Sequence, residues 1–152
     1  MRVRALEPAD AEPVAALVRD SLAGTRYEMR TMEIVACALD SASGECQGLV
    51  ALGPREDLRG VLVHGPLAGA DTVEKLHLLT GTSDALDALI TALAAARGRL
   101  VRMIVCELPS DLPFEPASRA LERASYRREG TVEGVFTSSV ALEIYVLRSR
   151  GE

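Results

Sequence analysis

The sequence has 152 residues, of which 48% are apolar and 26% charged, and its formal net charge is −5. This length and balance predict a single globular domain spanning residues 1–152. The acidic balance argues against nucleic-acid binding. No apolar run approaches the roughly 20 residues of a membrane span, and the first residues lack the apolar run of a signal peptide. We therefore expect a cytoplasmic protein that binds neither nucleic acid nor a membrane.

The first half of the chain predicts one strand, two helices and three further strands. Alternation predicts a strand at 2–6, and Asp10 is placed to cap a helix that ends at Gly24. A second helix is predicted at about 27–39, followed by a loop at 41–44. Strands at 46–52, 60–64 and 72–79 are separated by turns at 53–57 and 65–71, which carry proline and glycine.

The second half predicts a long helix at 84–96 ended by Gly98, and then a strongly apolar strand at 100–106, placed at the sheet centre. A loop at 108–113, a short helix at 116–124 and strands at 127–136 and 140–147 complete the chain. The order is β-α-α-β-β-β-α-β-α-β-β. Because a long helix followed directly by a strand implies a crossover and some parallel pairing, the order predicts an α+β fold: a mixed, mostly antiparallel central sheet flanked by helices in three layers.

The cysteines and histidines do not predict a metal site. Cys37, Cys46 and Cys106 are odd in number, and with His64 and His77 they form no zinc-ligand spacing. We expect free, mostly buried thiols and no bound metal.

Arginines gather late in the chain and allow two interpretations. They either form a solvent-exposed surface or provide a binding site for a phosphate-bearing ligand. The residues are Arg97, Arg99, Arg102, Arg119, Arg123, Arg127 and Arg128.

Four segments carry a resemblance to the GNAT superfamily of N-acetyltransferases. VRALEPADAEPVAALVRDSL (3–22) is similar to the family's first strand and helix, and ALITALAAARGRLVRMIVCELP (88–109) resembles its cofactor-side helix and next strand. ASRALERASYRREG (117–130) resembles the penultimate helix, and VEGVFTSSVALEIYVLRS (132–149) the final strand pair. The resemblance implies a GNAT-like domain that transfers an acetyl group from acetyl-CoA, or another acyl-CoA, to a small-molecule or peptide amine.

The resemblance also implies where acetyl-CoA would bind, although the sequence departs from the family there. The implied residues are Leu78, Leu79, Thr80, Gly81, Thr82 and Ser83. Family members open the following helix with glycines and a basic residue, because glycine lets the backbone approach the diphosphate. Here Asp84 and Leu86 stand at the glycine positions and Asp87 at a position that is often basic. The alternative is an ordinary helix cap at Thr82 or Ser83.

Three side chains are candidates for the general base: Glu74, His77 and Glu107. Alternation places Glu74 and His77 on opposite faces of one strand, so they are not expected to act as a pair. His77 has an ordinary pKa near 6.5 and suits a base, with a structural hydrogen-bonding role as the alternative. Glu107 ends the central strand, where it could instead cap the next loop.

The family's frequent general acid, a tyrosine on the penultimate helix, corresponds to Leu121, which cannot transfer a proton. Tyr126 and Tyr145 are predicted to be structural. These losses keep two other hypotheses open. One is a catalytically silent module that binds a partner or ligand, and the other is a structural half-site in a homodimer formed through the exposed edge of the closing strands.

Overall fold

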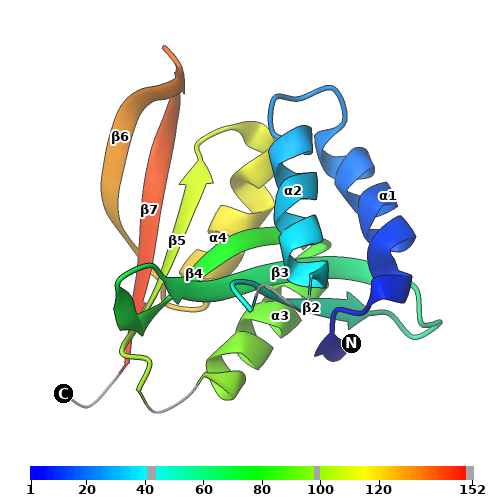
Figure 1. The fold of residues 1–152 in the computed structure, drawn as a ribbon. Coiled ribbons are helices and arrows are strands. Elements are labelled where there is room, and N and C mark those ends of the chain that lie inside the picture. Colours follow the sequence, from blue (N-terminus) through cyan, green and yellow to red (C-terminus); the bar gives the residue numbers. More distant parts are fainter. Residues whose placement is uncertain (41–43, 98–99, 150–152) are drawn as a thin grey trace.

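The computed structural model describes residues 1–40, 44–97 and 100–149 (Figure 1). Within these residues the chain forms the predicted order of seven strands and four α-helices, with two 3-10 turns. The elements are β1 (Arg2–Ala5), η1 (Pro8–Asp10), α1 (Ala11–Leu22), α2 (Glu28–Leu39), β2 (Gln47–Leu52), β3 (Leu58–Leu67), β4 (Ala70–Gly81), α3 (Ser83–Ala96), β5 (Met103–Pro109), η2 (Leu112–Phe114), α4 (Glu115–Arg123), β6 (Arg127–Thr137) and β7 (Val140–Arg148). Three predictions fall on residues outside the described ranges: part of the loop at 41–44, the end of the helix at Gly98, and Arg99 of the arginine cluster.

All seven strands form one sheet, in the order β1-β2-β3-β4-β5-β7-β6. β4 and β5 are parallel, and the other neighbouring pairs are antiparallel. The parallel pair follows from α3, which carries the chain from the end of β4 back to the start of β5. The predicted mixed, mostly antiparallel sheet and the central position of the apolar strand are therefore confirmed.

The predicted turn at 65–71 is wrong in extent, because most of it is strand. β3 continues to Leu67 and β4 begins at Ala70, which leaves only Ala68 and Gly69 between them. Pro66 is tolerated because β2 pairs with β3 no further than His64, so Pro66 has no neighbour on the β2 side that needs its missing N–H. Gly69 has φ +79°, which accounts for the tight turn.

β5, the strand between α3 and α4, and the loop after it also differ from their predicted ranges. The apolar segment at 100–106 begins to pair only at Met103, and the predicted loop at 108–113 starts later because Leu108 and Pro109 pair with β7. Leu108 is buried under α4, and this burial favours the extended backbone.

The helices cover the two faces of the sheet and divide the core in two. Leu76 and Ile104 pack on one face with residues of α3 and α4, among them Leu89 and Leu121. On the other face, α1 and α2 cover a second core, in which the strands contribute Val50, Val61, Val63 and Leu78. Figure 1 shows α1 and α2 together on one side and α3 on the other. None of the helices in the described residues has the length and apolar character needed to cross a membrane.

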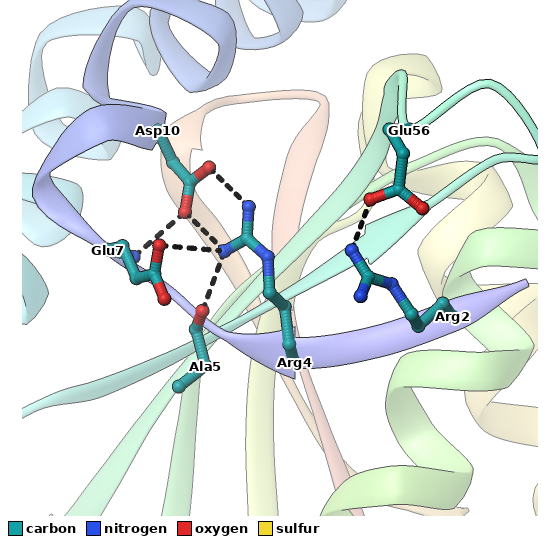
Figure 2. Close-up of polar contacts among 6 residues, drawn as sticks. All are labelled: Arg2, Arg4, Ala5, Glu7, Asp10 and Glu56. Carbon is teal, nitrogen blue, oxygen red and sulfur yellow. Dashed lines mark hydrogen bonds and ion pairs between the residues drawn. The ribbon is translucent and has the colours of Figure 1, made fainter.

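A half-buried ion pair joins β1 to the start of α1 (Figure 2). The guanidinium group of Arg4 donates to both carboxylate oxygens of Asp10, at 2.7 and 2.8 Å, and the Glu7 N–H donates to Asp10 Oδ2 at 2.8 Å. The hydrogen bonds from Arg4 hold the pKa of Asp10 below its ordinary value. Asp10 does occupy the N-cap position of α1, but its carboxylate makes no capping hydrogen bond to that helix. The capping therefore occurs one element earlier than predicted, because the Asp10 side chain forms a capping box with Glu7 at the start of η1, which runs directly into α1.

Candidate functional site

β4 and β5 separate at the centre of the sheet. Their parallel pairing runs from Val73–Met103 to Leu76–Cys106, whereas β4 continues to Gly81 and β5 to Pro109. Figure 1 shows the two strands running apart beyond this point. On the edge of β4 that faces β5, the backbone groups beyond Leu76 have no ladder partner among the described strands. Such groups need water or a ligand to satisfy them.

A β-bulge in β4 lies where the separation begins. On β3, Val63 is opposite Leu78 and His64 is opposite Leu76, so His77 is the extra residue. Leu78 belongs to the core under α1 and α2, and Leu79 to the core on the opposite face. The bulge thereby places His77 and Leu78 on the same side of the sheet, the side that α2 covers.

His77 lines two cavities on this side of the sheet. The larger, of about 600 Å³, also includes Cys37, Cys46 and Lys75. The smaller, of about 290 Å³, includes Glu107. Burial lowers the pKa of His77, and the positive charges of Lys75 and Arg30 lower it further. The imidazole is therefore neutral at neutral pH and can accept a proton.

The structure brings Glu107 together with His77, whereas Glu74 lies elsewhere. Glu107 lines the smaller cavity, and its Oε2 lies 3.4 Å from the ammonium nitrogen of Lys75. Glu74 contacts His64 Nδ1 at 2.5 Å and lines neither of the two cavities that contain His77. Of the three candidates for the general base, the structure therefore brings His77 and Glu107 together in one cavity and leaves Glu74 in contact with His64.

The turn from β4 into α3 has a backbone that only glycine accommodates. Gly81 has φ +146°, and a Cβ atom there would lie 2.4 Å from the carbonyl oxygen of Arg59. Thr82 is the N-cap residue of α3, but its side chain makes no capping hydrogen bond. The free N–H groups of the first turn of α3 are therefore left without a side-chain cap.

The six residues implied for cofactor binding do not share one surface. Leu79, Thr80 and Gly81 line a cavity of about 210 Å³ together with residues of α3, η2 and α4. Leu78 faces the other side of the sheet, in the cavity that contains His77 and Glu107. Thr82 and Ser83 begin α3. The set surrounds the separation of β4 and β5 from both sides.

Arg123 is a residue of this region whose role the sequence did not single out. From α4, its guanidinium group reaches Asp87 Oδ1 at 2.9 Å and Ser83 Oγ at 3.2 Å, both on α3. The arginine cluster was the sequence signal, but the structure divides that cluster among separate carboxylates. The ion pairs are Arg119–Glu115, Arg123–Asp87 and Arg128–Glu143.

Tyr126 and Tyr145 line neither of the cavities that contain His77. Leu121 is fully buried in the core, as is the ring of Tyr126, whose hydroxyl has no hydrogen-bond partner in the described part of the chain. The hydroxyl of Tyr145 contacts Ser118 and donates to Glu143 at 2.7 Å. Burial raises the pKa of Tyr145 to about 12. In residues 1–40, 44–97 and 100–149, no three His, Cys, Asp or Glu side chains gather in a way that could hold a metal ion.

Comparison with known proteins shows the fold. No family model matches the sequence, and no curated protein does. A proposed GNAT-family acetyltransferase from Desulfovibrio desulfuricans has a similar structure, with a TM-score of 0.74 and 19% identity over 97% of this chain and 98% of that one.

Two further solved structures agree along their whole length. The aminoglycoside 6'-N-acetyltransferase from Enterococcus faecium has a TM-score of 0.76 at 14% identity, over 100% of both chains. Arabidopsis thaliana NAA60, solved in complex with a bisubstrate analogue, has a TM-score of 0.71 at 19% identity over 99% of both chains. The chain therefore has the GNAT fold, as the sequence resemblance predicted.

Proposed function

We propose that this protein is an acyl-CoA-dependent N-acyltransferase that acetylates a primary amine. The observation that carries the proposal is the separation of β4 and β5, with His77 held by a bulge where it begins. A shared fold does not by itself establish an activity. The proposal therefore rests on this arrangement of backbone edge, base and cavities within a fold whose similar structures include acetyltransferases.

The residues present fit acetyl-CoA at two places. The unpaired edge of β4 beyond Leu76 offers backbone donors and acceptors to the amide groups of the pantetheine arm. The uncapped first turn of α3 offers N–H groups to the diphosphate, and Arg123 adds a positive charge beside that turn. Asp87, which would repel a diphosphate, is already paired with Arg123. When bound there, acetyl-CoA supplies the activated acetyl thioester.

His77 is the general base of the proposed reaction. Because its lowered pKa keeps the imidazole neutral, it can take the proton that the acceptor amine loses. Glu107 lines the same cavity and attracts the ammonium form of the acceptor from solution. Glu74 is a weaker candidate for the base because it is bound to His64.

The acceptor is a small-molecule or peptide amine. Of the three similar structures named above, only the Enterococcus faecium enzyme has a name that specifies an acceptor, an aminoglycoside, so these names do not choose the acceptor for this chain. We further expect the protein to act in the cytoplasm. β6 lies at the edge of the sheet, where it could pair with a second copy to form a homodimer.

One observation favours a second candidate function, a catalytically silent module that binds a partner or ligand. Leu121 stands where the family's proton-donating tyrosine is expected, and it is fully buried. In this case the GNAT fold would serve recognition only.

The first experiment measures thermal unfolding with and without saturating acetyl-CoA. A ligand at about 100 times its Kd stabilises the folded protein by roughly 2.7 kcal/mol, which should raise the unfolding midpoint of a chain of this size by roughly 5–10 °C. Release of free CoA in the presence of a panel of amines then measures transfer. Stabilisation without any release of CoA would favour the silent module, and no stabilisation by any acyl-CoA would reject the enzyme.

A further inference from the structure

Aromatic side chains gather around one cavity of the candidate site. The chain has three tyrosines, two phenylalanines and no tryptophan. Three of these five residues, Tyr27, Phe114 and Phe136, line the cavity of about 290 Å³ that also contains His77 and Glu107. They come from the start of α2, from η2 and from the end of β6, segments that are far apart in the sequence. An aromatic-poor chain thus places most of its rings at one place beside the proposed base.

The three rings contact one another in a fixed arrangement. Tyr27 packs edge-to-face on Phe114, with centroids 4.8 Å apart and an interplanar angle of 88°, and on Phe136 at 5.6 Å and 77°. Two long-range hydrogen bonds hold these segments together. The Tyr27 hydroxyl donates to Asp111 Oδ2 at 3.1 Å, and Arg26 donates to the carbonyl oxygen of Phe136 at 2.7 Å. The rings are therefore held in place before any ligand binds, which lowers the entropic cost of binding.

The remaining lining divides by element. The separating strands contribute the polar pair His77 and Glu107 together with Leu78, Leu79, Leu108 and Pro109, and α2 contributes Arg30, Thr31 and Ile34. The volume is near the roughly 300 Å³ at the lower end of small-molecule sites. A ligand that fills such a cavity has one flat apolar group at the rings and one amine at the strand side, where it would share the Glu107 carboxylate with Lys75.

The charge of the lining limits how many cationic groups the ligand can carry. Arg26 and Arg30 both line the cavity, and the carboxylate of Glu107 lies 3.4 Å from the ammonium nitrogen of Lys75. Arg30 is paired with Glu33 at 3.0 Å, whereas among the described residues Arg26 binds a neutral carbonyl and no carboxylate. A second or third ammonium group on the ligand would be repelled by Arg26, so the lining disfavours polyamines and aminoglycosides.

We infer that this cavity binds an arylalkyl monoamine as the acetyl acceptor, with the aryl group against Tyr27, Phe114 and Phe136 and the amine beside His77 and Glu107. The inference rests on the proposed function and adds the class of acceptor to it. Aromatic rings favour an aryl group in stacked or edge-to-face contact. They also favour an ammonium group at a ring face, so the amine is attracted before it loses its proton.

The test compares 2-phenylethylamine with n-butylamine and spermidine as acceptors at saturating acetyl-CoA. We expect kcat/KM for 2-phenylethylamine to exceed both others by at least tenfold. Phe136→Ala should raise the KM for 2-phenylethylamine about tenfold with kcat within about twofold, and Phe136→Leu should recover part of the loss. Val132→Ala, an exposed change on the same strand outside the cavity, should leave both constants unchanged.

Direct binding separates this inference from the proposed function. Binding of 2-phenylethylamine without CoA, followed by calorimetry, should weaken in Phe136→Ala even if the protein transfers no acetyl group. In that outcome the aryl site stands and the transferase proposal fails. If acetyl transfer occurs but spermidine or n-butylamine equals 2-phenylethylamine, or if Phe136→Ala and Val132→Ala behave alike, the aryl site is rejected while the transferase proposal stands.

Discussion

Arg123 and Asp87 form an ion pair across the gap between α4 and α3, with Nη2 and Oδ1 2.9 Å apart. The pair lies at the first turn of α3, because the same guanidinium group also reaches Ser83 Oγ. The family places glycine and basic residues in this turn, and this chain places aspartates there instead. Arg123 can therefore neutralise Asp87 and replace the missing basic residue from another helix.

This arrangement predicts opposite effects for the two partners on acetyl-CoA binding. Arg123→Ala should weaken binding roughly tenfold, about 1.4 kcal/mol, because a positive charge near the diphosphate is lost and Asp87 is left unpaired. Asp87→Asn should strengthen binding, because it removes the repulsion and frees the guanidinium group. Calorimetric titration with acetyl-CoA measures both effects.

Arg119→Ala is the matched control for Arg123→Ala. Like Arg123, Arg119 lies on α4, where it pairs with Glu115 of the same helix. Its loss should leave acetyl-CoA binding unchanged. S-acetyl-pantetheine, which carries no diphosphate, should bind all these variants equally. Equal weakening by both arginine variants would mean that general surface charge, and not Arg123 itself, assists binding.

The role proposed for His77 predicts the pH dependence of acetyl transfer. A base works in its neutral form, so kcat rises with pH as His77 loses its proton. Because burial lowers its pKa below the ordinary 6.5, the rise should be complete by about pH 7. His77→Gln should lower kcat by roughly a hundredfold and abolish this rise. A variant that keeps both the rate and the pH profile would exclude His77 as the base.

Glu107→Gln and Glu74→Gln locate the roles of the carboxylates. Glu107→Gln should raise the KM for the amine severalfold, since the residue lines the cavity and attracts the cation, and should leave the pH profile in place. Glu74→Gln should change stability more than rate, because its partner is His64. If Glu74→Gln, and not His77→Gln, abolished the rise of kcat with pH, Glu74 would be the base and His77 would not.

Most of the fold could be predicted because local patterns and the packing of the core agree. Val14, Val18 and Leu22 recur at helical spacing and are all buried in α1. The crossover at α3 required parallel pairing of the flanking strands, which β4 and β5 show. One error occurred at 65–71, where proline and glycine normally indicate a turn. Pairing with β4 keeps that segment extended, and such tertiary pairing leaves no local pattern in the sequence.

The site could be predicted only in part, because its geometry depends on contacts between distant segments. Alternation placed Glu74 and His77 on opposite faces, but no sequence pattern indicated the bulge at His77. The contact of Arg123 with Asp87 spans 36 residues and that of Tyr27 with Asp111 spans 84. Gathering of Tyr27, Phe114 and Phe136 follows from the tertiary fold alone, so the sequence showed only that aromatic residues are scarce.

Gly81 predicts a stability cost that comes from backbone geometry. In Gly81→Ala, the new Cβ would lie 2.4 Å from the carbonyl oxygen of Arg59 and 2.5 Å from Gly60 Cα, at φ +146°. We expect a loss of about 3 kcal/mol or more in the free energy of unfolding. Gly69→Ala is the control, since φ there is +79° but no heavy atom lies within 4 Å, and it should cost only about 1 kcal/mol. Equal midpoints of chemical denaturation for Gly81→Ala and Gly69→Ala would show that the contact with Arg59 can relax.

The ion pair of Arg4 with Asp10 predicts a pH-dependent contribution to stability. Asp10 is 6% exposed and accepts both hydrogen bonds from Arg4, so Arg4→Ala leaves a buried carboxylate without its cation. We expect a loss of about 2–4 kcal/mol at pH 7, measured by chemical denaturation. Arg2→Ala, which removes the exposed pair with Glu56 seen in Figure 2, should leave the denaturation midpoint nearly unchanged.

The sign of the pH effect follows from the lowered pKa of Asp10. A carboxylate whose pKa is lower in the folded state stabilises the protein above its unfolded pKa of about 3.9, and this contribution disappears as the pH falls through the folded pKa. The difference between the wild-type protein and Asp10→Asn should therefore be constant from about pH 5 to 8 and narrow below pH 4. A difference that stays the same down to pH 2 would mean that the charge of Asp10 does not account for it.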